Sequence, residues 1–212
     1  MNYIKQFLNA HGYEWTSEIE KAFSIYISEL KRWTKKINLT SIKDDREIEI
    51  KHIVDSLHAT KYVPRGTFLM DIGAGAGFPS LPIKIVESSL RVVMLEASEK
   101  KVAFINHVIR LLSLKNTMAI QQRAEDKNFA DIMRETVDVV IGRAVTSPEA
   151  FLKMGYPYVK RKGRIIYMLG KNQEPEEYRG VVKGLKLVEK FLDSYSLPDN
   201  MGDRKIWVLE KE

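Results

Sequence analysis

Glycines set at alternate positions mark the segment of this chain best suited to bind a small ligand. Gly73, Gly75 and Gly77 lie within DIGAGAGFP at residues 71–79. Glycine lets the backbone turn sharply and approach a ligand with no β-carbon in between. Apolar runs stand on both sides, FLM before the segment and LPIKIV after it, as is typical of a strand, a loop and a helix. The segment predicts a ligand-binding loop at the carboxyl edge of a parallel sheet, although structural turns can also produce G-x-G spacing.

Two acidic positions further along the chain fit a nucleoside. Glu96 ends the apolar run RVVMLE, about twenty residues after the glycines, where a carboxylate can accept hydrogen bonds from both ribose hydroxyls. Ala124 and Glu125 follow the next apolar run, TMAIQQR, where the rim of an adenine pocket would form. Because nicotinamide sites and S-adenosylmethionine (SAM) sites share the ribose-binding acid, these positions alone do not distinguish the two ligands.

The order of residues in the glycine loop does distinguish them. A pyrophosphate cradle requires G-x-G-x-x-G spacing and backbone amides free of competing negative charge. This loop has G-x-G-x-G spacing and follows Asp71. A carboxylate suits the ammonium and sulfonium groups of SAM better than it suits pyrophosphate. We therefore predict SAM as the cofactor, with Asp71, Gly73, Gly75, Gly77 and Glu96 among its binding residues.

The elements that position this loop change character near residue 65. Before it, apolar residues recur at helical spacing from Ile19 to Ile37, and a second helix carries the apolar residues of 50–57. After it come seven short apolar runs: FLMDIG (68–73), RVVMLEA (91–97), TMAIQQRA (117–124), VDVVIGRA (137–144), GRIIYML (163–169), KLVEKFLDSYSL (186–197) and RKIWVLEK (204–211). Five of them alternate with helical stretches, and two can pair as an antiparallel hairpin at the end.

This order predicts an α/β fold with a doubly wound, mostly parallel seven-stranded sheet of Rossmann-like type. We expect an N-terminal helical extension at residues 1–65 and the nucleotide-binding domain at 66–212, joined in one compact unit. No apolar run approaches the ~20 residues needed to cross a bilayer, and the first residues lack a signal-peptide pattern. We therefore expect a cytoplasmic protein with no membrane partner.

The charge of the chain suits a nucleic-acid partner. The net charge is +6, and residues 153–190 contain ten Lys or Arg and four Glu, a surplus equal to the whole net charge. This segment is either a solvated basic face or a landing surface for phosphate. The absence of cysteine excludes disulfides, zinc–thiolate sites and thiol nucleophiles. No set of His, Asp and Glu has metal-ligand spacing, so no metal is expected.

Five motifs taken together resemble one protein family. They are NLTSI (38–42), HIVDS (52–56), DIGAGAGFP (71–79), RAE (123–125) and VIGRAV (140–145), in family order and with family-like spacing. The family is the GidB/RsmG family of bacterial 16S ribosomal RNA methyltransferases. The resemblance covers residues from about 20 to the end. It implies a class I SAM-dependent methyltransferase fold, SAM as cofactor, and methylation of N7 of a guanosine in 16S ribosomal RNA or the small ribosomal subunit.

The resemblance also assigns roles to particular cofactor residues. Gly73 and Phe78 would line the cofactor, Ala124 and Glu125 would contact its adenine end, and Glu96 would take the ribose. One departure lies next to this loop: the family usually continues FPG, whereas this chain has serine at position 80.

On the substrate side, the resemblance places Arg143 beside the cofactor and the incoming base, as the catalytic residue. It assigns RNA contacts to Asn38 and His52, although a helix end or turn is the simpler explanation of Asn38 and a hydrogen-bonded structural histidine explains His52 equally well. The family tends to have L-K-G after the fifth strand, whereas this chain reads Leu169-Gly170-Lys171, so Lys171 would supply the charge from a shifted position.

The expected chemistry asks little of the protein. Guanine N7 has an in-plane lone pair and no proton, so its methylation needs orientation and no general base. Arg143 is then a clamp for guanine O6 or for phosphate. A monomer is expected. Methylation of another nucleic acid or a small molecule stays open as an alternative, since a fold does not fix a substrate. A non-catalytic RNA-binding assembly protein is a further alternative.

Overall fold

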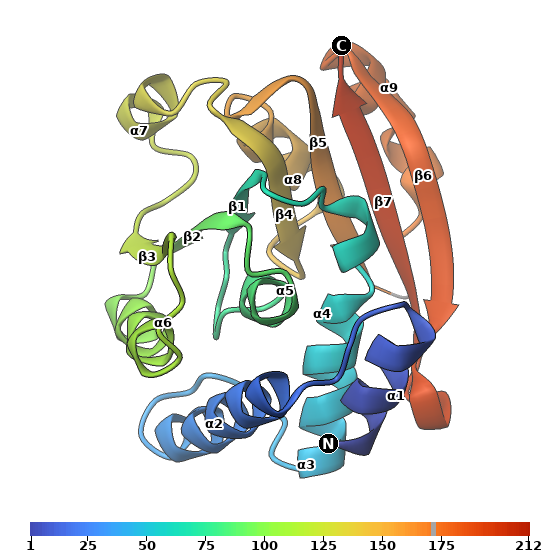
Figure 1. Ribbon diagram of the computed structural model, residues 1–212. Helices are drawn as coiled ribbons and strands as arrows, with labels where there is room; N and C mark the ends of the chain where they lie inside the picture. Colours follow the sequence, from blue (N-terminus) through green and yellow to red (C-terminus); the bar gives the residue numbers. More distant parts are fainter. Residues whose placement is uncertain (171–172) are drawn as a thin grey trace.

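The computed structural model describes residues 1–170 and 173–212. Its centre is a seven-stranded sheet in the order β3-β2-β1-β4-β5-β7-β6 (Figure 1). The strands are β1 (Phe68–Ile72), β2 (Arg91–Glu96), β3 (Thr117–Gln121), β4 (Val137–Arg143), β5 (Val159–Leu169), β6 (Leu187–Ser196) and β7 (Asp203–Lys211). Strands β1 to β5 are parallel, and β7 is antiparallel to β5 and β6. The predicted sheet and its closing hairpin are confirmed.

Helices cover both faces of the sheet. One apolar core lies under the N-terminal helices, α5 and α6, and the other lies under α7, α8 and α9. The α-helices are α1 (Asn2–Ala10), α2 (Ser17–Thr34), α3 (Asp45–Ile48), α4 (Asp55–Leu57), α5 (Ser80–Val86), α6 (Glu99–Leu111), α7 (Lys127–Ile132), α8 (Pro148–Gly155) and α9 (Arg179–Gly184). Short 3₁₀ segments lie at Thr60–Tyr62, Pro175–Tyr178 and Pro198–Asn200.

The N-terminal helices share the core of the sheet. Ile4, Phe23 and Leu69, from α1, α2 and β1, are all fully buried in one cluster. The helical extension is confirmed as structure, whereas its boundary at residue 65 stays a prediction. Within residues 1–170 and 173–212, no helix is long and apolar enough to cross a membrane.

The second predicted helix differs from the expectation in its winding. Between α3 and α4 the chain forms a π-helix at Glu49–Val54. A π-helix has a wider turn than an α-helix and is frequent at functional sites. The apolar positions Ile50, Ile53 and Val54 are buried as expected, and their spacing gives no sign of the wider turn. The π-helix carries His52, which lies at the candidate site.

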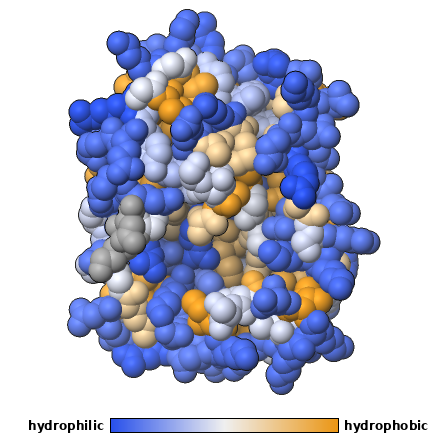
Figure 2. All heavy atoms as spheres, turned by 180° about the vertical axis from the view of Figure 1, so that it is seen from behind, coloured by the Kyte–Doolittle hydropathy of each residue, from blue (hydrophilic) through white to orange (hydrophobic). Residues whose placement is uncertain are grey.

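The order of the strands creates a crevice next to β1. The chain passes from β1 to β2 and β3 on one side and then returns to β4 and β5 on the other. Ligands bind at such a reversal, outside the carboxyl ends of the strands. Figure 2 shows a mostly hydrophilic face with a hollow near its middle, walled by hydrophobic and near-neutral residues.

Candidate active site

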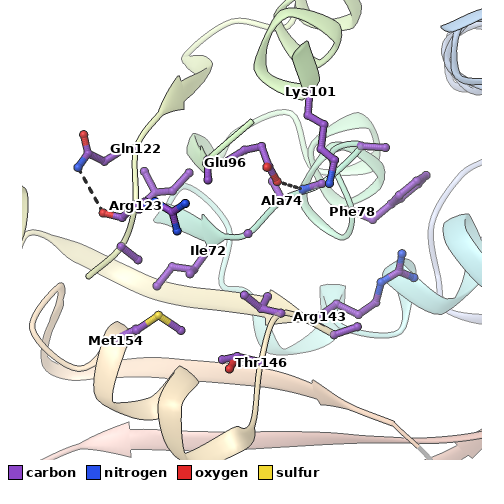
Figure 3. Close-up of a pocket in the computed structure, with 18 of the residues that line it drawn as sticks. Ile72, Ala74, Phe78, Glu96, Lys101, Gln122, Arg123, Arg143, Thr146 and Met154 are labelled. Carbon is purple, nitrogen blue, oxygen red and sulfur yellow. Dashed lines mark hydrogen bonds between the residues drawn. The ribbon is translucent and has the colours of Figure 1, made fainter. Parts of the chain in front are cut away.

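A cavity of about 540 Å³ lies at this reversal point. Most of its walls come from four segments at the carboxyl ends of strands β1 to β4: residues 72–76 with Phe78, 95–97, 122–125 and 143–146. The other lining residues are Leu39, Thr40, His52, Lys101 and Met154. Figure 3 places Phe78 and Arg143 at one end and Gln122 and Arg123 at the other, with Glu96 and Ala74 between them. The volume lies within the range of about 300–1,000 Å³ that is usual for sites of small organic ligands.

The three loop glycines serve different purposes. Gly73 and Gly75 line the cavity with φ of 72° and 60°, in the left-handed region that favours glycine. A β-carbon on Gly75 would have no protein atom nearer than the Gly73 carbonyl oxygen at 4.0 Å, so a side chain there would enter the cavity. Gly77 does not line the cavity. A β-carbon there would overlap the Leu81 side chain of α5, so this glycine serves helix packing.

Glu96 is held at the cavity wall by backbone amides. Its Oε2 accepts a hydrogen bond from the Gly75 N–H at 2.9 Å, and its Oε1 accepts one from the Ser98 N–H at 2.9 Å. Because each carboxylate oxygen can accept a second hydrogen bond, the side chain keeps capacity for two ligand hydroxyls. The loop and the acid are therefore one connected unit.

Ala124 and Glu125 line the opposite end, beside Gln122 and Arg123. The Tyr158 hydroxyl donates to the Ala124 carbonyl oxygen at 2.6 Å and anchors this segment to the start of β5. The apolar walls between the two ends include Ile72, Leu95, Val145 and Met154. These wall residues, together with Lys101 and Thr40, are not among the site residues predicted from the sequence. Thr40 lies within the NLTSI motif, whereas Lys101 has no sequence signal.

Asp71 does not reach the cavity, which corrects the contact expected from the sequence. Its side chain is fully buried, and its Oδ2 accepts a hydrogen bond from the Ser80 N–H at 3.2 Å. Burial raises the pKa of this carboxyl to about 7. Ser80 is the first residue of α5, and the positive end of the helix dipole stabilises the Asp71 carboxylate beside it. Serine is tolerated there because the position is helical and needs no glycine.

Phe78, His52 and Arg143 form the other end of the cavity. The rings of His52 and Phe78 stack with centroids 4.6 Å apart, and the Arg143 guanidinium lies 5.2 Å from the Phe78 centroid. Arg143 Nη1 donates to the Lys51 carbonyl oxygen at 3.0 Å and to Asp55 Oδ2 at 2.9 Å. Arg143 is thus fixed by the π-helix and by α4, which are far from it in the sequence.

The hydrogen bonds also fix the tautomer of His52. Arg143 Nη2 lies 3.2 Å from His52 Nδ1, and since arginine only donates, Nδ1 must accept. The proton of the ring is then on Nε2, which lies 2.7 Å from Thr40 Oγ1. Burial, with the nearby positive charges of Arg143 and Lys51 acting in the same direction, lowers the pKa of His52 to about 3. His52 is neutral at physiological pH.

Comparison with known proteins assigns this architecture to a family. The model of the GidB family, described as "rRNA small subunit methyltransferase G", matches residues 19–195. The chain belongs to this family. The Ribosomal RNA small subunit methyltransferase G of Geotalea uraniireducens is 41% identical over 191 residues, which are 89% of this chain and 86% of that protein. The protein of the same name from Staphylococcus saprophyticus is 34% identical and covers 99% of this chain and 89% of its own length.

Solved structures show the fold of a class I SAM-dependent methyltransferase. A SAM-dependent methyltransferase from Aquifex aeolicus superposes with a TM-score of 0.59 at 15% identity, covering 87% of this chain and 98% of that chain. M. jannaschii TYW2 in complex with AdoMet superposes with a TM-score of 0.58 at 16% identity, covering 74% and 77%. The chain is a member of a methyltransferase family whose cofactor is SAM.

The cavity fits the cofactor of this family. SAM combines a ribose, an adenine and a charged methionine tail, and supplies an electrophilic methyl group on sulfur. Glu96 has hydrogen-bonding capacity for the ribose hydroxyls, and the apolar walls beside Ala124 suit the adenine ring. The backbone at Gly75 is open to the cavity and can be approached closely, whereas the missing β-carbon of Gly73 leaves room for the Val145 side chain. The placement of each ligand part stays a proposal, since it follows from donor chemistry alone.

The structure separates the residues expected to bind RNA. His52 lines the cavity, whereas Asn38 is exposed on the loop after α2 and does not line it. Lys171 lies outside the described residues. Parts of the basic segment 153–190 lie away from the cavity: Lys160 pairs with Asp138 at the start of β4, at 3.0 Å, and α9 lies beside the C-terminus at the opposite end of the sheet (Figure 1). Met154 of the same segment lines the cavity, and the segment as a landing surface for phosphate stays a prediction.

Proposed function

We propose that this protein transfers a methyl group from SAM to N7 of a guanosine in 16S ribosomal RNA of the small ribosomal subunit. The family relatives named above carry the ribosomal RNA part of this proposal. The choice of N7 rests on the chemistry of the end of the cavity that holds Phe78 and Arg143.

The observation that supports N7 is that the proton acceptors at this end are already engaged. His52 Nδ1 faces Arg143 Nη2, Asp55 Oδ2 accepts from Arg143, and Asp55 Oδ1 accepts from the Tyr195 hydroxyl at 2.7 Å. Among the described residues that line the cavity, the carboxylates are Glu96, which lies between the two ends and is bound by backbone amides, and Glu125, at the end opposite Phe78. Methylation of an exocyclic amine must dispose of a proton, whereas N7 has none. A site without a free base therefore suits N7.

Arg143 supplies the means to orient the guanine. A guanidinium has five N–H donors, and three hydrogen bonds hold this one to Lys51, Asp55 and His52. The remaining donors can bind guanine O6 and leave N7 free toward the methyl group. The Phe78 ring next to it offers a face for stacking. Catalysis then consists of holding N7 in line with the methyl group.

The proposal is tested by mapping a labelled methyl group. The protein is incubated with methyl-labelled SAM and with either deproteinised 16S ribosomal RNA or small subunits, and the modified nucleoside is identified. We expect 7-methylguanosine at a single site. Label on an exocyclic nitrogen, on a small molecule or on protein contradicts the proposal. SAM binding without any transfer favours a non-catalytic RNA-binding protein.

We further propose that the protein acts as a monomer in the cytoplasm. The proposal is supported by the fact that the glycine loop, Glu96 and Arg143, which the reaction uses, already meet within one copy of the chain. Sedimentation of the active protein, with and without SAM, tests this point. A stable dimer with activity that falls on dilution contradicts it.

A further inference from the structure

A second pocket lies beside the cavity and shares a wall with it. Its volume is about 440 Å³, and its floor is apolar, formed by Leu30 of α2, Ile42 of the following loop and Ile48 of α3. Thr40 lines both this pocket and the SAM cavity. The same Thr40 hydroxyl contacts His52, which stacks on Phe78. A ligand in the second pocket would therefore lie next to the end of the cavity that holds Phe78 and Arg143.

The rim of this pocket is basic. Lys31, Lys35 and Lys43 line it, and its lining includes no acidic residue. Lys31 pairs with Asp45 at 2.5 Å. Lys35 and Lys43 are exposed, and the ion pairs found within residues 1–170 and 173–212 include neither of them. An apolar surface of this kind can contact a nucleobase, and the two cations beside it can bind the phosphate of the same nucleotide.

At the end of the cavity that holds Phe78, the cation is already paired, while Lys101 and Arg123 line other parts of its wall. Asp55 neutralises Arg143 in a nearly buried pair, with side chains 5% and 15% exposed. The cations of residues 160–162 and of α9 lie at the other end of the sheet (Figure 1). Lys35 and Lys43, by contrast, lie one wall away from the cavity.

We propose that this lysine-rimmed pocket binds an unpaired nucleotide of the RNA strand next to the target guanosine. Its base lies on Leu30, Ile42 and Ile48, and its phosphate lies between Lys35 and Lys43. This inference rests on the proposed function, because it takes RNA as the substrate. Single-stranded loops can splay their bases in this way at small cost. The pocket gives the enzyme a second contact that fixes the strand while the target base occupies the cavity.

The first test removes the rim charges. The double variant Lys35→Glu with Lys43→Glu is compared with the matched control Arg179→Glu with Lys183→Glu, which makes the same change in charge on α9. We expect the first to raise the KM for RNA at least tenfold, with SAM affinity within twofold of wild type. Its log–log salt dependence of RNA binding should become shallower by about 0.7, since the two lysines neutralise one phosphate and each single-strand phosphate contributes about 0.7. The control should stay within twofold. The reverse ranking overturns the proposal.

The second test asks whether a base occupies the pocket. Thr34 lines the pocket at the end of α2, so Thr34→Phe should fill it. RNA substrates with one abasic position on either side of the target are assayed with both proteins. We expect one abasic position to weaken binding to wild type about tenfold and to have no further effect on Thr34→Phe. Equal sensitivity of both proteins at every position overturns the proposal. The variant's SAM affinity and melting temperature show whether it is folded.

The outcomes separate this proposal from the proposed function. If wild type methylates RNA and all variants equal it, the pocket proposal alone fails. If wild type binds SAM but neither binds nor methylates RNA, both fail. If the rim variant loses activity on small subunits but retains it on deproteinised RNA, the pocket contacts a ribosomal protein, and the nucleotide assignment is wrong.

Discussion

The part of the cavity that holds the cofactor and the end that receives the target guanine, called the base end below, are built in different ways. In the cofactor part, Glu96 and the glycine loop are joined by backbone amides, and the contributing residues follow two adjacent parallel strands. At the base end, Arg143 of β4 is held by Asp55 of α4, by the π-helix, and indirectly by Tyr195 of β6. The cofactor part depends on backbone geometry, and the base end depends on side chains brought together from distant parts of the sequence.

This difference predicts that variants in the two parts fail in different ways. A change in the glycine loop should remove cofactor binding, because the backbone itself forms the wall. A change in the Arg143 network should leave cofactor binding in place and slow methyl transfer, because it disturbs only the orientation of the base. Variants that reverse this division would show that the two parts do not act separately.

The largest effect is expected at Gly75. Gly75→Val places a branched side chain in the cavity at a φ of 60° that valine rarely adopts. We expect SAM affinity to fall more than a hundredfold in calorimetry. Gly180→Val on α9 is the matched control, because no atom lies within 4 Å of a β-carbon there, and it should bind SAM as wild type does. Retained affinity in Gly75→Val would show that SAM does not approach this turn.

A smaller effect, confined to turnover, is expected at Arg143. Arg143→Lys keeps the charge but cannot reproduce the planar set of donors that contacts Asp55, Lys51 and His52. We expect kcat to fall about a hundredfold, with SAM affinity within threefold of wild type. Arg164→Lys serves as the control, since Arg164 binds a backbone carbonyl at the other end of the sheet. A large loss of SAM affinity in Arg143→Lys would place this residue on the cofactor.

These two parts of the cavity differ in how well they can be predicted from the sequence. The glycine loop and Glu96 are local patterns on adjacent strands, so spacing alone predicts that they meet. Asp55 and Tyr195 are separated by 140 residues, and no periodicity reveals that both serve Arg143. The winding at Glu49–Val54 is equally hidden, because the apolar residues at 50, 53, 54 and 57 recur at ordinary α-helical spacing in the sequence. Asp71 misled because a carboxylate before the loop can face either the ligand or the start of α5, and its sequence position is the same in both cases.

A moderate effect should distinguish Glu96 from Asp71. Glu96→Gln keeps the size of the side chain and removes its charge, so SAM affinity should fall about tenfold as the ribose bonds weaken. Asp71→Asn should change SAM affinity less than threefold, because its side chain does not line the cavity. Binding constants for the two variants, measured side by side, check this ranking. A larger loss in Asp71→Asn would restore the direct contact first expected from the sequence.

The smallest effect at neutral pH is expected from replacing His52, which mainly changes how the free energy of unfolding depends on pH in acid. Because the pKa of His52 in the folded protein is about 3 and the usual value is 6.5, the unfolded chain binds the proton more readily. The stability due to neutral His52 is complete above pH 6.5 and is lost as the pH falls toward 3, by roughly 5 kcal/mol at most. His52→Gln should flatten this part of the curve of unfolding free energy against pH. His58→Gln should flatten it less, since the pKa of His58 is about 4.

The bond from Tyr195 to Asp55 has a consequence for the order in which the site is completed. Tyr195 lies in β6, well after all the residues that line the cavity in the sequence, and it acts through Asp55. During synthesis the glycine loop, Glu96 and Arg143 leave the ribosome before β6 has been made. A nascent chain can therefore form the cofactor part of the cavity first, and it gains the full support of Asp55 and Arg143 only when the closing hairpin joins the sheet. Competence to hold the target base thus comes after competence to hold the cofactor, once β6 and β7 have been made.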